Sequence, residues 1–252
     1  MDMASLPRAV ELASPGARNP RWHPGGQAAL HSEIFAPAGE ASGAGAALAL
    51  ALDGLRARGN DADAGASAEE RSILWVQDKA ARRLGGRPYR PGLPENLRHR
   101  LIHVAAKTPE DALFALEEGV RCRDLACVIG EVAGNPRALT FTASRRLSLT
   151  AERHGVPLFL VRLDAETDLS SARMRWQMRA APSAPPLWNP AAPGHPAWQA
   201  QLFRARSHAP GEWILRDGKS FLAAERLADG HDTHGEQPEE KVGNMALVGG
   251  NG

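Results

Sequence analysis

The alternation of apolar and polar segments along the chain predicts buried strands separated by helices. Short and mainly apolar runs lie at residues 33–36, 73–76, 100–104, 125–129 and 158–161. The runs at 73–76 and 125–129 are apolar throughout, which is typical of buried parallel strands. Helical segments are expected at residues 46–52, 108–123 and 139–154. This order predicts an α/β fold with a mostly parallel sheet flanked by helices.

Particular residues indicate where two of these helices begin and end. Thr108 can cap the start of the helix at 108–123, and Pro109 suits its first helical position. Gly155 is expected to end the helix at 139–154, and Pro157 to lead into the next strand.

The pattern changes after residue 170. Residues 173–179 and 198–206 alternate between polar and apolar types, which is typical of strands with one exposed face. Six prolines between residues 182 and 196 predict a stiff connector, and Asp217-Gly218 between two apolar runs predicts a hairpin. We expect an antiparallel C-terminal extension whose apolar face packs on the rest of the sheet: Met174, Trp176, Met178, Trp198, Leu202, Trp213 and Leu215.

These features divide the chain into four parts. Residues 1–30, rich in Pro, Gly and Ala, are interpreted as a poorly ordered arm, and residues 31–170 as the α/β core. Residues 171–224 form the β extension with its Pro-rich connector. Residues 225–252 are interpreted as a disordered acidic tail, because they offer few apolar groups to bury.

The composition argues against several classes of protein, namely disulfide-rich, zinc-binding, secreted and membrane-spanning ones. Two cysteines, Cys122 and Cys127, cannot support a disulfide-stapled scaffold, and they lack a second Cys/His pair at zinc spacing. Cys127 is expected in the core and Cys122 at the surface. The N-terminus lacks the layout of a secretory signal, and no apolar run approaches the ~18 residues of a membrane span. We therefore expect a cytoplasmic protein without a membrane partner.

The net charge is +1, but the charges are unevenly distributed. Residues 71–181 carry 19 basic and 12 acidic residues, whereas residues 223–252 carry two basic and six acidic ones. A basic body can bind DNA or an acidic partner locally, since steering depends on patches rather than on the total charge. Basic residues are densest at Arg145-Arg146 with Arg153, and at Arg173, Arg175 and Arg179.

The turn after the first strand lies where an ATP-binding α/β protein carries its phosphate loop. Its Gly39, Ser42, Gly43 and Gly45 do not fit the spacing G-x-x-x-x-G-K-[ST], and the nearest downstream lysine is Lys79. Without that lysine the loop lacks the charge that reaches the terminal phosphates. We interpret it as a degenerate nucleotide loop and expect no cofactor.

Two acidic residues follow buried strands and are interpreted as relic positions. Cys127-Val128-Ile129 is followed by Gly130 and Glu131, where a magnesium site would carry Asp. Asp78 follows the strand at 73–76. No catalytic residue and no metal site is expected.

Arg173, Arg175 and Arg179 occupy alternating positions of a predicted strand, so we expect them on one exposed face. They are candidate contacts to a protein partner or to DNA phosphate, because arginine suits both ligands. A merely solvated face is the alternative that remains open.

Several sequence blocks, among them "EDALFALEEGVRC" and "ARMRWQMRAAPSA", closely resemble the ImuA proteins. ImuA proteins are catalytically degenerate RecA relatives from bacterial damage-inducible mutagenesis cassettes. The resemblance covers about residues 30–222. It implies a RecA-like core in which Asp78 stands near the position of the catalytic acid, without a phosphate lysine to act with. It also implies a non-catalytic accessory factor of SOS-induced translesion DNA synthesis.

The partners implied by this resemblance are ImuB, an inactive relative of Y-family polymerases, and an error-prone C-family DNA polymerase. RecA is a further candidate partner. A SulA-like inhibitor of cell division is the alternative, although SulA-type chains are typically shorter and lack the long extension at 172–222. A residual ATPase ranks third.

Overall fold

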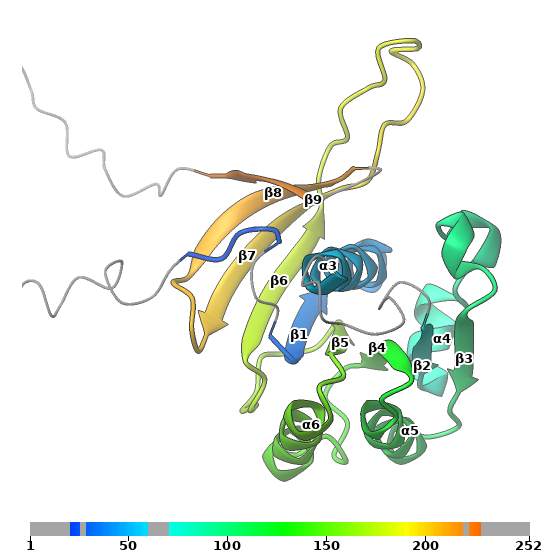
Figure 1. The fold of residues 1–252 in the computed structure, drawn as a ribbon, viewed down its shortest axis with the longest axis vertical. Coiled ribbons are helices and arrows are strands. Elements are labelled where there is room, and N and C mark those ends of the chain that lie inside the picture. Colours follow the sequence, from blue (N-terminus) through cyan, green and yellow to red (C-terminus); the bar gives the residue numbers. More distant parts are fainter. Residues whose placement is uncertain (1–20, 26–28, 60–70, 219–221, 228–252) are drawn as a thin grey trace, which may run out of the picture.

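The computed structural model describes residues 21–25, 29–59, 71–218 and 222–227. All its strands belong to one nine-stranded sheet with the order β3-β2-β4-β5-β1-β6-β7-β8-β9. Figure 1 shows the strongly curved sheet running from β3 at one edge to β9 at the other.

The parallel half of the sheet contains five strands from the predicted α/β core. They are β1 (His31–Ala36), β2 (Ser72–Gln77), β3 (Leu101–Ala105), β4 (Leu125–Ala133) and β5 (Leu158–Leu163). Each pairs in parallel with its neighbours. Their carboxyl ends therefore meet at one edge. The predicted α/β fold is confirmed.

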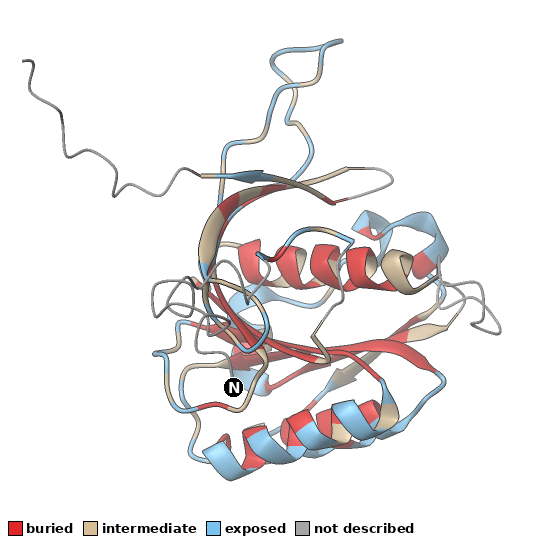
Figure 2. Cartoon of the chain, turned by 60° about the vertical axis from the view of Figure 1, so that its left-hand side comes forward, coloured by how far each residue is buried: buried red, intermediate tan, exposed pale blue. Residues whose placement is uncertain are grey.

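Helices cover both faces of this half, as Figure 2 shows. One face carries α3 (Ser42–Gly59), α4 (Lys79–Gly85) and the short 3₁₀ turns η2 (Arg90–Gly92) and η3 (Glu95–Leu97). The other face carries α5 (Pro109–Arg121) and α6 (Phe141–His154). Because each face is covered, β2 and β4 are buried on both sides, as their apolar composition predicts. The edge strand β3 is less covered, and its Ile102 and Ala105 are exposed.

The helix ends follow from local chemistry. The Thr108 hydroxyl accepts a hydrogen bond from the Asp111 amide, and Pro109 is the first residue of α5. Thr140 caps α6 in the same way, so this helix begins at Phe141 rather than at residue 139. Gly155 ends α6 with φ of 71°, a left-handed conformation that glycine adopts at little cost. The predicted roles of Thr108, Pro109 and Gly155 are confirmed.

The C-terminal half of the sheet is antiparallel. It consists of β6 (Met174–Ala180), β7 (Ala197–Ala205), β8 (Gly211–Asp217) and β9 (Leu222–Arg226). β6 is the seam, since it pairs in parallel with β1 and antiparallel with β7. Asp217 pairs with Leu222 across the predicted hairpin, whose residues 219–221 lie outside the described part.

One face of this antiparallel half is apolar and packs toward α3. All seven predicted inner positions are buried: Met174, Trp176, Met178, Trp198, Leu202, Trp213 and Leu215. Trp22 packs edge-on against Trp176 and Trp213, with ring centroids 5.0 and 5.6 Å away. Trp22 is 7% exposed, so this part of the predicted arm instead belongs to the core.

Cys127 is buried and Cys122 is exposed, as predicted. None of the helices in the described ranges is long and apolar enough to cross a membrane.

The prediction of a disordered tail from residue 225 is wrong for its first residues, because β9 extends to Arg226 and the Leu227 amide donates to the Glu212 carbonyl. The predictions for residues 1–20 and 228–252 concern residues outside the described ranges.

Candidate functional site

The degenerate nucleotide loop lies between β1 and α3, at the carboxyl edge of the parallel strands. Gly39 is in the turn, and Ser42 begins α3. A Cβ atom on Gly43 would lie 2.7 Å from Val161 Cγ1 and 2.8 Å from Ala36 Cβ. Gly43 therefore allows α3 to approach β1 and β5 closely.

A second glycine of this loop is covered by the C-terminal extension. A Cβ atom on Gly45 would lie 3.1 Å from Cζ2 of the Trp198 indole. At the same turn, the Ala180 amide donates to Glu40 Oε2 at 2.7 Å, which ties the turn to the end of β6. A carboxylate at this position repels an approaching phosphate. The small residues of the loop thus serve packing between α3, the sheet and the extension.

Asp78 directly follows β2, as predicted, whereas Glu131 lies inside the neighbouring strand β4, where it is paired with Gln77. The expectation that Glu131 follows its strand is wrong, because β4 continues to Ala133. The Asp78 amide donates to the Glu131 carbonyl oxygen at 3.2 Å. Asp78 Oδ1 accepts from the Ala81 amide at 2.6 Å and so caps α4. Both side chains are buried, Asp78 at 1% and Glu131 at 3% exposure.

The Glu131 carboxylate belongs to a buried hydrogen-bond network. Its Oε1 accepts from Trp75 Nε1 at 2.5 Å and from Gln77 Nε2 at 3.1 Å. Gln77 also donates to the Gly86 carbonyl at 2.8 Å, and its Oε1 lies 2.9 Å from His103 Nε2. Each relic acid is therefore engaged in holding strands and helix together.

Burial is the main cause of the pKa shifts of Glu131 and His103 in this network. It raises the pKa of Glu131, while the hydrogen bonds from Trp75 and Gln77 oppose that rise. The pKa of His103 is lowered, first by burial and then by the positive charges of nearby arginines. Sequence reasoning overlooked Trp75 and Gln77. The polar Gln77 at a buried strand position was the available signal.

The expectation that three arginines of β6 share one exposed face is wrong for Arg175. Arg175 is 3% exposed, and its Nε donates to Glu33 Oε2 at 2.8 Å. Its guanidinium also lies over the rings of Phe35 and Phe203, 5.1 and 5.4 Å from their centroids. The physical reason is the position of β6 between β1 and β7, whose side chains cover Arg175 from both sides.

The remaining members of the set have different environments. Arg173 precedes β6 and is paired with Glu152 of α6. Arg179 is exposed near the end of the strand. The sequence signal was Glu33, an acid at the start of the predicted strand at 33–36, because a carboxylate buried in a sheet needs a cation nearby.

A second buried arginine completes this ion cluster. Arg162 of β5 is fully buried, 3.8 Å from Glu33 and 3.4 Å from Asp168. Asp168 also lies 3.8 Å from Arg175. Glu33 thus lies between two buried arginines, and the partly exposed carboxylate of Asp168 pairs with both of them.

The other basic group of the sequence lines a groove between α5 and α6. Arg145, Arg146 and Arg153 border this groove of about 340 Å³ together with Arg121 and Leu149. Arg146 is paired with Glu117 of α5. No acidic residue is among the described residues that line the groove.

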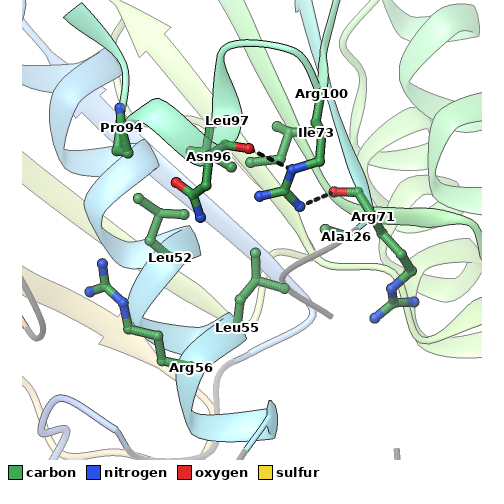
Figure 3. A pocket seen from close by; sticks show the side chains of 10 residues that line it. All are labelled: Leu52, Leu55, Arg56, Arg71, Ile73, Pro94, Asn96, Leu97, Arg100 and Ala126. Carbon is green, nitrogen blue, oxygen red and sulfur yellow. Dashed lines mark hydrogen bonds between the residues drawn. The ribbon is translucent and has the colours of Figure 1, made fainter. Parts of the chain in front are cut away.

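A smaller pocket between α3 and η3 is shown in Figure 3. Its volume is about 40 Å³, well below the ~300 Å³ of typical ligand pockets. Leu52, Leu55 and Leu97 form its apolar wall. Arg100 is held by the carbonyl oxygens of Asn96 and Arg71, at 2.7 and 2.9 Å. This pocket has no room for a nucleotide.

The described residues contain no group of three or more His, Cys, Asp or Glu that could hold a metal ion. Comparison of the chain with models of known protein families found no match, and neither did a search of curated proteins.

Proposed function

We propose that this protein is a non-catalytic accessory factor of SOS-induced translesion DNA synthesis. The observation that carries the proposal concerns the carboxyl edge of the parallel strands, where the acidic side chains are already bonded to other groups of the protein. There, Glu131 is bound by Trp75 and Gln77, and Asp78 caps α4. The groups that a RecA-like ATPase would turn toward ATP and Mg²⁺ are used here to stabilise the fold.

Phosphoryl transfer needs charges that this edge does not offer. Catalysis of that reaction rests on cations that neutralise the developing negative charge on phosphate. The loop at Gly39–Gly45 has no lysine, and Glu40 places a carboxylate beside it. This supports a role through protein contacts, with an ImuB-like protein, an error-prone C-family polymerase and RecA as the proposed partners in the cytoplasm.

The catalytic half of the proposal is tested by phosphate release. We expect the purified protein, with ATP, Mg²⁺ and single-stranded DNA, to release phosphate no faster than buffer. Turnover that disappears in Glu131→Gln, while an exposed control such as Glu118→Gln retains it, would show that the protein is an ATPase after all.

The partner half is tested by titrating the ImuB-like protein encoded in the same genome with the full chain. We expect saturable binding, and weaker mutagenesis after DNA damage when the gene is deleted. Cell filamentation on expression, without any effect on mutagenesis, would instead support the SulA-like alternative.

A further inference from the structure

The Pro-rich connector between β6 and β7 projects from the body of the molecule. Figure 1 shows residues 181–196 as the long yellow loop that extends past the ends of β6 and β7, and Figure 2 shows the same loop mostly exposed. Its contacts with the rest of the chain are at its base, where the Ala181 amide donates to the Ala197 carbonyl at 3.0 Å.

Internal contacts hold the two legs of this loop together. The Gly194 amide donates to Ser183 Oγ at 3.3 Å. A Cβ atom on Gly194 would lie 1.8 Å from the Ala184 carbonyl oxygen, so the legs touch at a point where only glycine fits. Six prolines further restrict the backbone between residues 182 and 196.

The end of the loop is shaped by consecutive turns. The Asn189 amide donates to the Pro186 carbonyl at 3.2 Å, and the Ala192 amide donates to the Asn189 carbonyl at 3.0 Å. Asn189 Oδ1 also accepts from the Ala191 amide at 3.1 Å. The conformation that presents the tip is therefore fixed before any partner binds, which lowers the entropic cost of association.

The tip carries two large apolar side chains in water. Leu187 is fully exposed and Trp188 is 80% exposed. The other five tryptophans of the chain are all buried in the core: Trp22, Trp75, Trp176, Trp198 and Trp213. An exposed Leu-Trp pair on a restrained loop is typical of a binding anchor, because tryptophan dominates the energetics of many protein interfaces.

We propose that Leu187 and Trp188 insert into an apolar pocket on a protein partner. Residues 180–203 contain no Lys, Arg, Asp or Glu, so the loop lacks the cations that would bind it to nucleic acid or to an anionic lipid surface. The apolar pockets found on this chain measure about 40 and 20 Å³, far too small for an indole. The larger groove between α5 and α6 is lined mainly by arginine and threonine side chains rather than apolar ones. The pockets of the described residues therefore favour a different protein, rather than a second copy of the chain, as the partner.

The choice of the ImuB-like protein as the partner rests on the proposed function. The experiment measures the dissociation constant of the full chain for that protein, in the wild type and in Trp188→Ala. Tyr89→Ala is the matched control, since Tyr89 is 74% exposed at a different part of the surface.

We expect Trp188→Ala to weaken binding by on the order of 30-fold, and Tyr89→Ala to leave it unchanged. Leu187→Ala should have a smaller effect in the same direction. All variants should keep the wild-type free energy of unfolding, because both tip side chains are in solvent.

Each other outcome overturns a defined part of the argument. If wild type and Trp188→Ala bind equally, the proposal that Trp188 inserts into the partner is wrong, while the proposed function stands. If wild type does not bind at all, the proposed function and the anchor both fail. Binding to phosphatidylglycerol vesicles or self-association that Trp188→Ala abolishes would replace the protein pocket with a membrane or a second copy.

Discussion

The parallel and antiparallel halves of the sheet treat polar side chains differently. In the parallel half, helices cover both faces, and Gln77 and Glu131 bond to each other inside the fold. In the antiparallel half, one face packs on α3, while Gln199 and Gln201 of β7 are exposed on the other. A polar residue in a strand therefore indicates a buried network in the first half and a solvated surface in the second.

β6 lies at the boundary and shows both behaviours. Arg175 is buried beside Glu33, whereas Arg179, four residues later, is exposed. The alternation of polar and apolar residues is the same at both positions. What differs is the cover from β1 and β7, so neighbouring strands decide which arginine is available to a partner.

The largest effect on stability is expected when the buried arginine of β6, Arg175, is replaced. Arg175→Met should lower the free energy of unfolding by about 3–5 kcal/mol, because it leaves Glu33 buried with its closest cation removed. Arg179→Met, the matched control on the same strand, should change it by less than about 0.5 kcal/mol. Denaturant unfolding of both variants measures the difference, and equal effects would show that Arg175 is not a buried ion-pair partner in solution.

The difference between local alternation and cover from neighbouring strands also explains which features could be predicted from the sequence. Apolar runs predicted the parallel strands, and the spacing of Met174, Trp176 and Met178 correctly predicted the inner face of β6. Those inferences need only local periodicity. The burial of Arg175 depends on Glu33, which lies 142 residues away in sequence, and local periodicity carries no information about that pairing.

The site of the two relic acids, Asp78 and Glu131, was also predicted only in part. The sequence predicted that Asp78 and Glu131 follow neighbouring strands. The two residues are indeed close together, but Glu131 lies inside β4, which continues to Ala133. Their bonds to Ala81 and Trp75 could not be predicted, because those depend on how α4 and the indole pack against the sheet.

The next effect concerns acid sensitivity on the covered face of β1. His31 is fully buried, and its Nδ1 lies 2.7 Å from Ser148 Oγ of α6. Burial, assisted by Arg173 and Arg175 and opposed by Glu152, lowers its pKa to about 3. The unfolded chain binds the proton near pH 6.5, so the stability held by neutral His31 is complete above that pH and is lost as pH falls toward 3.

This loss amounts to about 1.4 kcal/mol per pH unit, or about 2 kcal/mol between pH 6.5 and pH 5. His31→Gln should lose about that much less than wild type between pH 7 and pH 5, because glutamine does not titrate. Urea unfolding at the two pH values measures this difference, in which the other titrating groups cancel. Identical losses in both proteins would mean that His31 is protonated at no cost in the native state.

The smallest effect is expected at Arg173, which lies between the two extremes of the arginine set. Its side chain is 25% exposed and is paired with that of Glu152, which is 36% exposed. Hydrogen bonding to Glu152 raises the pKa of Arg173, but water screens a pair with this much exposure. Arg173→Ala should therefore cost about 0.5–1 kcal/mol, and most of that cost should vanish in high salt. Unfolding at low and high ionic strength, with Arg179→Ala as the control, measures it. A cost of several kcal/mol that does not depend on salt would show that Arg173, like Arg175, forms a buried ion pair. The buried part of β6 would then begin before Met174.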